Sequence, residues 1–220
     1  MKFSCDKHLI QSAAATAARA ASAKSPIPAL EGLLIQAGAG VRLTGYDLKK
    51  GIYTTIEADV ERPGSAVLNA KLFTEMLRRL PDGIVTVEVG EQNAVKVKCG
   101  RSAYDFIAID AEEYPELPEM DESEAVSIPQ KTLKAMIDET IFAVSTNESR
   151  PVYMGSMFEI GGGQLTLVSV DGYRLALRRE KLEGSGREGL AFIIPGTALQ
   201  DISRICADSD EQVLINVGAK

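Results

Sequence analysis

Few side chains in this chain have the types and spacing that catalysis requires. The single histidine, His8, stands at the start of a predicted helix, with no cysteine or paired carboxylates at metal-ligand spacing. The glycine runs at 161–163 and 184–186 fall between predicted strands, where glycine serves hairpin turns, and neither has the lysine and hydroxyl of a phosphate-binding loop. Glu112 and Glu113 lie in an acidic, proline-containing stretch. We therefore predict no catalytic residue, no metal site and no cofactor, so the protein is expected not to be an enzyme.

Two loops carry the most distinctive polar and aromatic side chains. Residues 145–153 form a polar loop with one arginine, Arg150, and residues 170–175 read Val-Asp-Gly-Tyr-Arg-Leu. In the second loop, Asp-Gly is a turn signal between two predicted strands, followed by an aromatic residue and an arginine. Taken alone, each loop is better explained as a structural connection than as part of a binding site.

Composition narrows the class of protein. The three cysteines, Cys5, Cys99 and Cys206, form no close pair, which favours reduced, buried thiols in a cytoplasmic protein. An apolar run of about 18 residues is missing, and the first residues lack the apolar core of a signal peptide. The formal net charge of −7, taken as an average, argues against nucleic acid and membranes as partners.

The chain repeats one pattern twice. Residues 2–89 and 126–217 each run through a strand, an amphipathic helix, a block of strands, a second helix and a closing alternating strand. Matched order with almost no identity predicts two copies of one structural unit, which is more typical of repeat-built architectures than of single-site enzymes.

Apolar spacing places the elements in each copy. Three- and four-residue spacing predicts helices over 7–23 and 70–80 in the first copy, and over 130–144 and 196–206 in the second. Alternation predicts strands over 52–60, 85–89, 95–99 and 104–109, and over 157–160, 165–170, 176–180 and 191–194. We predict an α+β fold, in which two helices pack on one face of an antiparallel sheet in each copy.

An acidic stretch separates the copies. Residues 112–124 hold seven acids and two prolines, so they can form neither a helix nor a central strand. We therefore expect a first domain over 1–111, an acidic linker over 112–125 and a second domain over 126–220. Nothing after Val217 corresponds to the strands 95–99 and 104–109, so we expect the second domain to be incomplete and the chain to be a fragment.

Basic residues concentrate on the predicted helices. Residues 7–24 carry Lys7, Arg19 and Lys24 with no acid, and residues 70–80 carry three cations against Glu75. A protein that is acidic overall but basic on one layer can present that layer to phosphate and repel phosphate elsewhere. Solvated helix faces remain the alternative explanation.

Several motifs together resemble the bacterial sliding clamp family, the beta subunit of DNA polymerase III. The motifs are Met-Lys-Phe at 1–3, Ser-Pro-Ile-Pro-Ala-Leu at 25–30, Leu-Thr-Gly-Tyr-Asp-Leu at 43–48, Glu-Tyr-Pro-Glu-Leu-Pro at 113–118 and Val-Asp-Gly-Tyr-Arg-Leu at 170–175. They follow the family's order and spacing across essentially the whole chain, and the last two are the most specific.

The resemblance implies a DNA-clamp fold and a role in DNA replication. In that family, clamp domains form a ring, with helices lining a hole and sheets forming the outer wall. The ring would encircle duplex DNA without sequence preference and act as a non-catalytic processivity factor. The implied partners are the polymerase III catalytic subunit, the clamp loader and other clamp-binding proteins, with no membrane.

The resemblance also assigns residues by position. Lys24 matches a DNA-contacting arginine, and Asn147 and Arg150 belong to a loop that touches DNA. Charge and helix position add weaker inner-face candidates: Lys7, Arg19, Lys71, Arg78, Arg79, Lys131, Lys134 and Arg204. One wall of a pocket for partner peptides is implied at Tyr153, Val170, Gly172, Tyr173, Arg174 and Leu175. Tyr104 and Phe106 match an edge strand that meets a neighbouring protomer.

The chain departs from the family in length. Family members have three such domains and close the ring as head-to-tail homodimers, whereas the third domain is absent from this chain. We therefore expect that this polypeptide alone neither closes a ring nor holds polymerase peptides well. The main alternative is a duplicated clamp-like module that binds only protein, and a hydrolase using paired carboxylates is a distant third.

Overall fold

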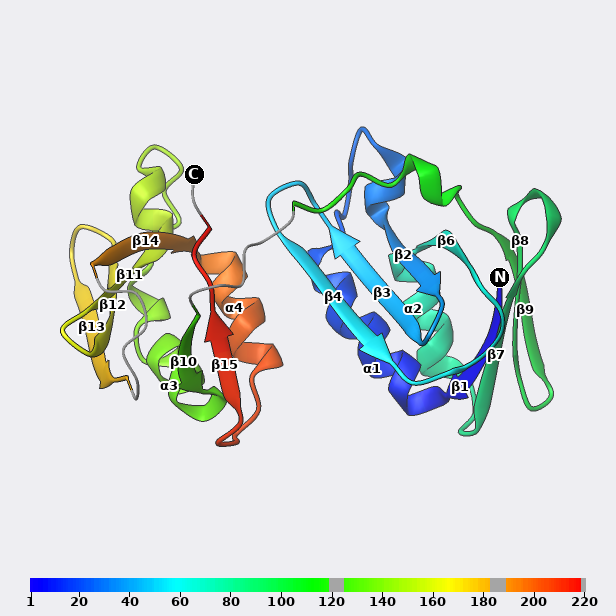
Figure 1. Cartoon of the computed structure of the whole chain (residues 1–220). Helices are drawn as coiled ribbons and strands as arrows, with labels where there is room; N and C mark the ends of the chain where they lie inside the picture. Colours follow the sequence, from blue (N-terminus) through cyan, green and yellow to red (C-terminus); the bar gives the residue numbers. More distant parts are fainter. Residues whose placement is uncertain (119–124, 183–188, 219–220) are drawn as a thin grey trace. The chain divides into compact units, whose positions relative to one another are not determined.

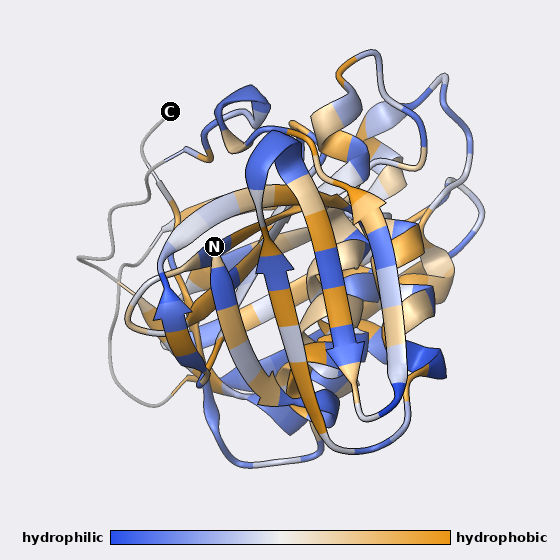
Figure 2. Ribbon diagram, turned by 90° about the vertical axis from the view of Figure 1, so that its right-hand side faces the viewer, coloured by the Kyte–Doolittle hydropathy of each residue, from blue (hydrophilic) through white to orange (hydrophobic). Residues whose placement is uncertain are grey.

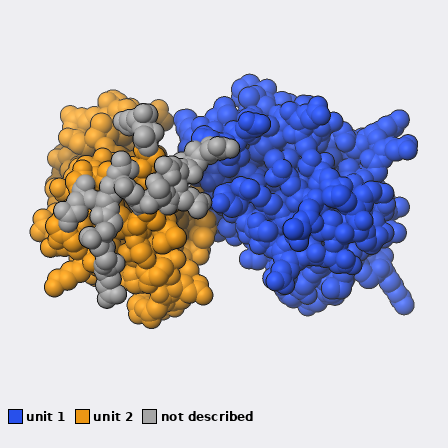
Figure 3. Space-filling model, in the orientation of Figure 1, with its two compact units in different colours: residues 1–118 blue, residues 119–220 orange. Residues whose placement is uncertain are grey.

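The chain folds into two compact units, residues 1–118 and 119–220 (Figure 3). The computed structural model describes residues 1–118, 125–182 and 189–218. No helix in these ranges is long and apolar enough to cross a membrane. Each unit has a hydrophobic core of its own.

Unit 1, residues 1–118, contains two helices and two antiparallel sheets (Figure 1). The helices are α1 (Lys7–Ala17) and α2 (Ala70–Arg79). The first sheet has the order β5-β1-β7-β8-β9, and the second has the order β4-β3-β2-β6. The strands are β1 (Lys2–Asp6), β2 (Gly32–Ala37), β3 (Val41–Tyr46), β4 (Gly51–Ile56), β5 (Asp59–Arg62), β6 (Gly64–Asn69), β7 (Ile84–Val89), β8 (Ala94–Cys99) and β9 (Ser102–Ile107).

Unit 2, residues 119–220, repeats this order. Its helices are α3 (Gln130–Asp138) and α4 (Gly196–Ile205), and its described strands form one four-stranded and one two-stranded sheet, β13-β12-β11-β14 and β10-β15. The strands are β10 (Val126–Pro129), β11 (Gly155–Gly161), β12 (Gln164–Val170), β13 (Leu175–Lys181), β14 (Leu190–Pro195) and β15 (Gln212–Ile215).

Side-chain N-caps begin both helices of unit 1. The Asp6 carboxylate accepts a hydrogen bond from the His8 backbone N–H at 2.7 Å and caps α1, and the Asn69 side chain caps α2 through the Leu72 N–H at 2.9 Å. Helix α1 packs closely on β3, because a Cβ on Gly45 of β3 would lie 2.1 Å from the Ala17 carbonyl oxygen. Only glycine allows this approach of helix to strand.

The core of each unit lies between helices and sheets. In unit 1, Phe3, Ile10, Leu43 and Phe73 are fully buried in one cluster. In unit 2, Phe158 is buried with Met136 and stacks on Phe192 with ring centroids 5.4 Å apart. Figure 2 faces the five-stranded sheet of unit 1, where hydrophilic and hydrophobic bands alternate along the strands because alternate side chains point into the core.

The α+β prediction is confirmed, with three corrections. The predicted strand 52–60 is two strands, β4 and β5, which belong to different sheets. Among the described residues, each unit also has two sheets where a single sheet was expected. The two longer helices are also shorter than predicted, because 3-10 turns at Ala18–Ala20 and Ile141–Ala143 replace their last turns.

The first half of the predicted acidic linker packs onto unit 1. Tyr114 is 7% exposed, and its hydroxyl donates to the Thr44 carbonyl oxygen at 3.2 Å. Burial raises the pKa of Tyr114 to about 12, which keeps the phenol protonated as a donor. Tyr114 shares a second cluster with Leu30, Tyr46 and Val67. Residues 119–124 of the predicted linker lie outside the described residues.

Two of the three cysteines predicted to be buried are buried, and Cys206 is half-buried. All three cysteines are free, and Cys5 and Cys99 are buried. Burial raises the pKa of the Cys5 thiol to about 12. The Cys5 thiol therefore stays protonated and packs as a small apolar group.

Replacement of Tyr114 by alanine is expected to destabilise unit 1. Removing a buried aromatic side chain costs about 3–5 kcal/mol, and Tyr114→Phe, which removes only the hydrogen bond, costs about 1 kcal/mol. Urea unfolding monitored by circular dichroism measures both. The control is Glu116→Ala on the same segment, where the side chain is exposed. Equal stability of all three variants would contradict the packing role of Tyr114.

Candidate functional site: a basic helical layer and an apolar loop surface

The two helices of unit 1 contact each other and carry exposed cations. Lys71 and Arg78 on α2 and Lys24 after α1 are exposed, and Arg19 is half-buried. Lys7, also predicted for this face, is 8% exposed and its ammonium lies 3.4 Å from Asp82. We define Arg19, Lys24, Lys71 and Arg78 as the basic layer of unit 1. Lys7 is instead held in an ion pair with Asp82.

The helices of unit 2 present less free positive charge. The Lys131 ammonium lies 2.7 Å from Asp210, and Lys134 donates to the Ser203 carbonyl oxygen at 2.8 Å and lies 3.4 Å from Asp138. Arg204 is exposed near the end of α4. Neighbouring acids thus offset much of the charge on this helical layer.

A groove of about 150 Å³ runs between α2 and β9 in unit 1. It contains both residues predicted for the protomer edge, Tyr104 and Phe106, together with Arg79, which was predicted to face DNA. β9 is the last strand of its sheet among the described residues, so its outer backbone groups are available for pairing. Leu72 and Met76 supply the apolar floor on the helix side.

The turn after β12 in unit 2 is built around Asp171. The Asp171 carboxylate accepts from the backbone N–H groups of Tyr173 and Arg174 at 3.0 and 3.1 Å, and the Arg174 guanidinium lies 2.8 Å away. These hydrogen bonds lower the pKa of Asp171 below its usual value. Gly172 at φ 96° provides the left-handed residue of the turn. The turn therefore fixes the backbone at Tyr173, whose side chain is fully exposed.

The two polar loops of the sequence come together in unit 2. A guanidinium nitrogen of Arg150 would lie 3.6 Å from a Cβ placed on Gly172, and Arg150 also lies over the Tyr153 ring at 5.9 Å from its centroid. Asn147 is exposed on the same loop, where its side chain accepts from the Ser149 N–H. Arg150, predicted as a DNA contact, is thus next to residues predicted for the peptide pocket.

Exposed apolar side chains surround these loops. Leu175 is 62% exposed at the start of β13, and Val152 is similarly exposed beside Tyr153. Phe142, which the sequence patterns did not single out, lies under the Arg174 guanidinium at 5.4 Å. The sequence did contain a signal for Phe142, because this large apolar residue directly follows the last core-facing position of the predicted helix. It therefore falls on the exposed side.

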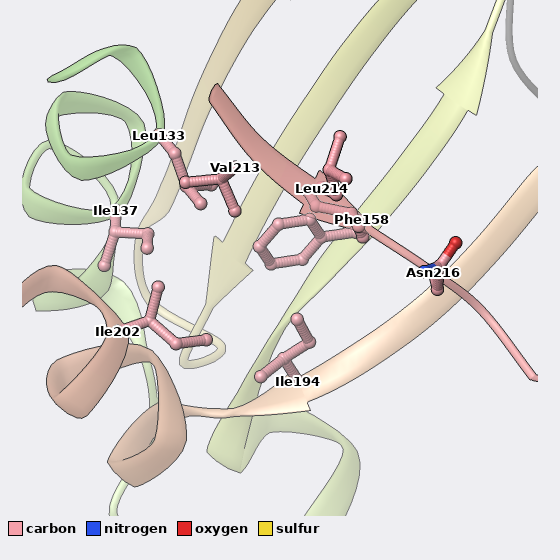
Figure 4. Close-up of a pocket in the computed structure, with 9 residues that line it drawn as sticks. Leu133, Ile137, Phe158, Ile194, Ile202, Val213, Leu214 and Asn216 are labelled. Atoms are coloured by element: carbon pink, nitrogen blue, oxygen red, sulfur yellow. The ribbon is translucent and has the colours of Figure 1, made fainter. Parts of the chain in front are cut away.

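A separate apolar cavity of about 260 Å³ opens within unit 2 (Figure 4). Ile137 and Ile202 approach it from the two helices, Phe158 and Ile194 from the larger sheet, and Val213 from β15. Its only polar lining residue is Asn216, whose buried Oδ1 has no hydrogen-bond partner within the described part of the chain. A cavity of this composition has no groups for acid–base or nucleophilic chemistry.

The described residues contain no cluster of histidine, cysteine and carboxylate side chains that could hold a metal ion. Two tandem α+β units with a basic helical layer and an apolar, arginine-bearing loop surface define a repeat-built binding protein.

Comparison with known proteins assigns the family. Residues 1–118 match the family model described as DNA polymerase III beta subunit, N-terminal domain, and residues 127–220 match the central domain of the same subunit. The chain therefore belongs to the DNA polymerase III beta subunit family.

Relatives and solved structures agree with this assignment. The beta sliding clamp of Bacillus subtilis (strain 168) is 36% identical over 222 residues, covering 97% of this chain and 59% of that protein. The crystal structure of a DNA polymerase sliding clamp from Bacillus subtilis matches with a TM-score of 0.95 at 34% identity, over 100% of this chain and 60% of that one. The DNA polymerase III subunit beta from Pseudomonas aeruginosa matches with a TM-score of 0.91 at 26% identity, with the same coverage. The resemblance seen in the sequence is confirmed, and the chain spans about 60% of the length of these relatives.

The loop built on Asp171 is expected to lose order when this carboxylate is removed. In Asp171→Ala, the amides of Tyr173 and Arg174 lose their acceptor, so their hydrogen exchange should become faster while exchange in the core strands stays unchanged. Asp110→Ala is a matched control, because Asp110 accepts from Glu112 in the same way in unit 1. Unchanged exchange at residues 173 and 174 would show that Asp171 does not hold the loop.

Proposed function

We propose that this polypeptide supplies two domains of a ring-shaped sliding clamp that encircles duplex DNA and tethers a replicative polymerase. The observation that carries the proposal is the tandem repetition of one clamp unit in a chain of the beta subunit family. A closed ring holds DNA by topology, so the protein needs no tight or sequence-specific contact. Tethering keeps the polymerase at high effective concentration near the primer end, which raises processivity without chemistry in the clamp.

The basic layer of unit 1 suits a surface that slides on DNA. Lys24, Lys71 and Arg78 are exposed, and attraction of such side chains to phosphate is independent of base sequence and exchanges readily. The overall net charge of −7 means that the remaining surface repels DNA. Duplex DNA is therefore favoured only along the helical layer.

Ring closure would use the edge of unit 1. β9 has an unpaired edge within the described sheet, and the groove beside it exposes Tyr104 and Phe106. Backbone pairing with a neighbouring protomer would continue the sheet across the joint, in a head-to-tail homodimer of the complete protein.

Partner proteins would engage the loop surface of unit 2. Tyr153, Val170 and Leu175 supply apolar contacts there, while Arg150 and Arg174 supply positive charge. Short peptides of the polymerase catalytic subunit, the clamp loader and other clamp-binding proteins fit such an apolar surface with nearby arginines. All of these partners would meet the protein in the cytoplasm.

A protein-interaction module without DNA binding is the competing function. The relatives at 36% identity are named beta sliding clamps, which disfavours this alternative. The net charge of −7, which favoured this alternative, comes from acidic residues in the strands and loops, because the helices carry an excess of basic residues.

A topological test separates the two functions. A chimera that joins this chain to the remaining C-terminal part of the Bacillus subtilis relative would be loaded onto nicked circular DNA by that species' clamp loader. We expect the chimera to stay bound during gel filtration and to be released when the circle is linearised. Equal retention on circular and linear DNA, or no retention on either, would reject the ring.

Charge removal on the basic layer should weaken the electrostatic attraction to DNA. In the chimera, Lys71→Ala with Arg78→Ala is expected to reduce the slope of log affinity against log salt by about 0.9 for each phosphate that is no longer neutralised. The matched control is Lys98→Ala with Arg101→Ala, two exposed cations on the hairpin of β8 and β9. An equal change in both double variants would count against the basic layer.

A further inference from the structure

One row of charged side chains crosses the outward face of the five-stranded sheet of unit 1, which faces the viewer in Figure 2. On β8, Lys96 alternates with buried valines, so its side chain points away from the core. Lys96 is the direct cross-strand neighbour of Glu88 on β7, and Glu88 is that of Lys2 on β1. On its other side, Lys96 lies opposite Asp105 on β9. The row therefore alternates in charge across four neighbouring strands.

Ion pairs accompany this alternation. The Lys2 ammonium lies 2.6 Å from the Glu61 carboxylate on β5, and the Lys96 ammonium lies 3.8 Å from the Asp105 carboxylate. Lys2, Glu88 and Lys96 thus have oppositely charged neighbours on both sides. Asp105 ends the row with a neighbour on one side only, and its side chain is 72% exposed. The charge pattern is therefore incomplete at β9.

The chain itself leaves the edge beyond Asp105 open. β9 is the last strand of its sheet among the described residues. The residues that follow turn away from this edge, because the Ala108 N–H donates to the Asn93 carbonyl oxygen at 2.8 Å. Ile109 then bridges to Val67 on β6, in the other sheet, with hydrogen bonds of 2.9 and 3.0 Å. The segment after β9 consequently covers the four-stranded sheet and not the edge of β9.

The other side of the same edge faces the groove between α2 and β9. Tyr104 and Phe106 lie there against Leu72 and Met76, and Arg79 of α2 is exposed beside them. A strand added to β9 would meet both sides, because successive side chains of a strand point to opposite faces. Aromatic contacts would lie on the groove side, and a single acidic contact, at Asp105, would lie on the outward side.

We propose that the strand that closes the ring at β9 carries a basic residue directly opposite Asp105, and that Asp105 thereby determines which strand pairs with this edge. Directly opposite side chains on antiparallel strands have Cβ atoms about 4.5–5.5 Å apart, so opposite charges stabilise the pairing and like charges destabilise it. The inference rests on the ring closure proposed above and names the chemistry of the closing strand.

The same carboxylate opposes pairing of β9 with β9 of a second copy. An antiparallel pair centred on residue 105 would place Tyr104 of one copy opposite Phe106 of the other, which aromatic contacts favour. This register also sets two Asp105 carboxylates opposite each other, and it brings an Arg79 from each copy to the same groove. Charge therefore opposes the register that the aromatic residues favour, and it favours a different edge of the neighbouring protomer, as in head-to-tail closure.

The probe is the Asp105→Lys variant of the 220-residue protein, which offers the same edge with a basic residue at its centre. Unlabelled variant would be titrated into ¹⁵N-labelled unsubstituted protein, with amide shifts at residues 102–107 as the readout. We expect the two proteins to associate about fivefold more tightly with each other than either does with itself. The preference should shrink at high salt, because both charges are exposed and screened.

Two further variants test the position of the charge. Asp59→Lys makes the same change on β5, at the opposite edge of the same sheet, and should associate with the unsubstituted protein no better than that protein does with itself. Asp105→Asn should self-associate more tightly than the unsubstituted protein, because it removes the repulsion. Thermal unfolding verifies that each variant is folded. Equal self-association and mixed association, or no association in the mixture, would overturn the proposal.

The chimera separates this failure from failure of the clamp function. If the mixture shows no charge preference while the chimera is still retained on nicked circular DNA, only the role of Asp105 is rejected. If the mixture associates as expected while the chimera is not retained, the ring is rejected and the charge preference of the β9 edge stands.

Discussion

A β-sheet has two faces, and the helices of each unit can cover only one face of each sheet. The other face must be polar or must be covered by another segment, because a large exposed apolar surface binds other molecules. Most features of this protein follow from this constraint. Unit 1 satisfies it with charged residues on its five-stranded sheet and with the segment containing Tyr114 on its four-stranded sheet. Unit 2 keeps apolar side chains on the equivalent outer face.

The same constraint separates the charged and the apolar surfaces of the units. Helices α1 and α2 use alanine, phenylalanine and leucine to face the core, so their cations remain on the opposite side, as at Lys71 and Arg78. In unit 2, the exposed Met157 alternates with the buried Phe158 along β11, so Met157 lies on the sheet face that is turned away from the core. The helical layer and the outward face of the sheet therefore carry different kinds of exposed side chain.

Duplication lets the two units diverge while the scaffold is kept. The registers of the four-stranded sheets agree residue by residue, including the glycine under the edge strand. What differs is the outward set, in which Gly51 is replaced by Leu175 and Val67 by Ile193. The ion pair at the start of the first helix is kept, by contrast, because Lys7 pairs with Asp82 in unit 1 and Lys131 pairs with Asp210 in unit 2. The outward-facing side chains thus differ between the units while the fold is the same.

Patterns along the chain were enough to establish the repeat, the α+β class, the four helices and the family. The spacing of apolar residues and the positions of turn residues depend only on neighbouring residues in the sequence. They also identified the loop at 170–175 through its Asp-Gly turn. Tertiary packing was needed to show that 52–60 divides between two sheets, that Lys7 is buried, that Arg79 lies beside β9, and that Arg150 meets Gly172. Packing also determines which outer face is covered. These outcomes depend on contacts between residues far apart in the chain, which alternation along a single strand cannot reveal.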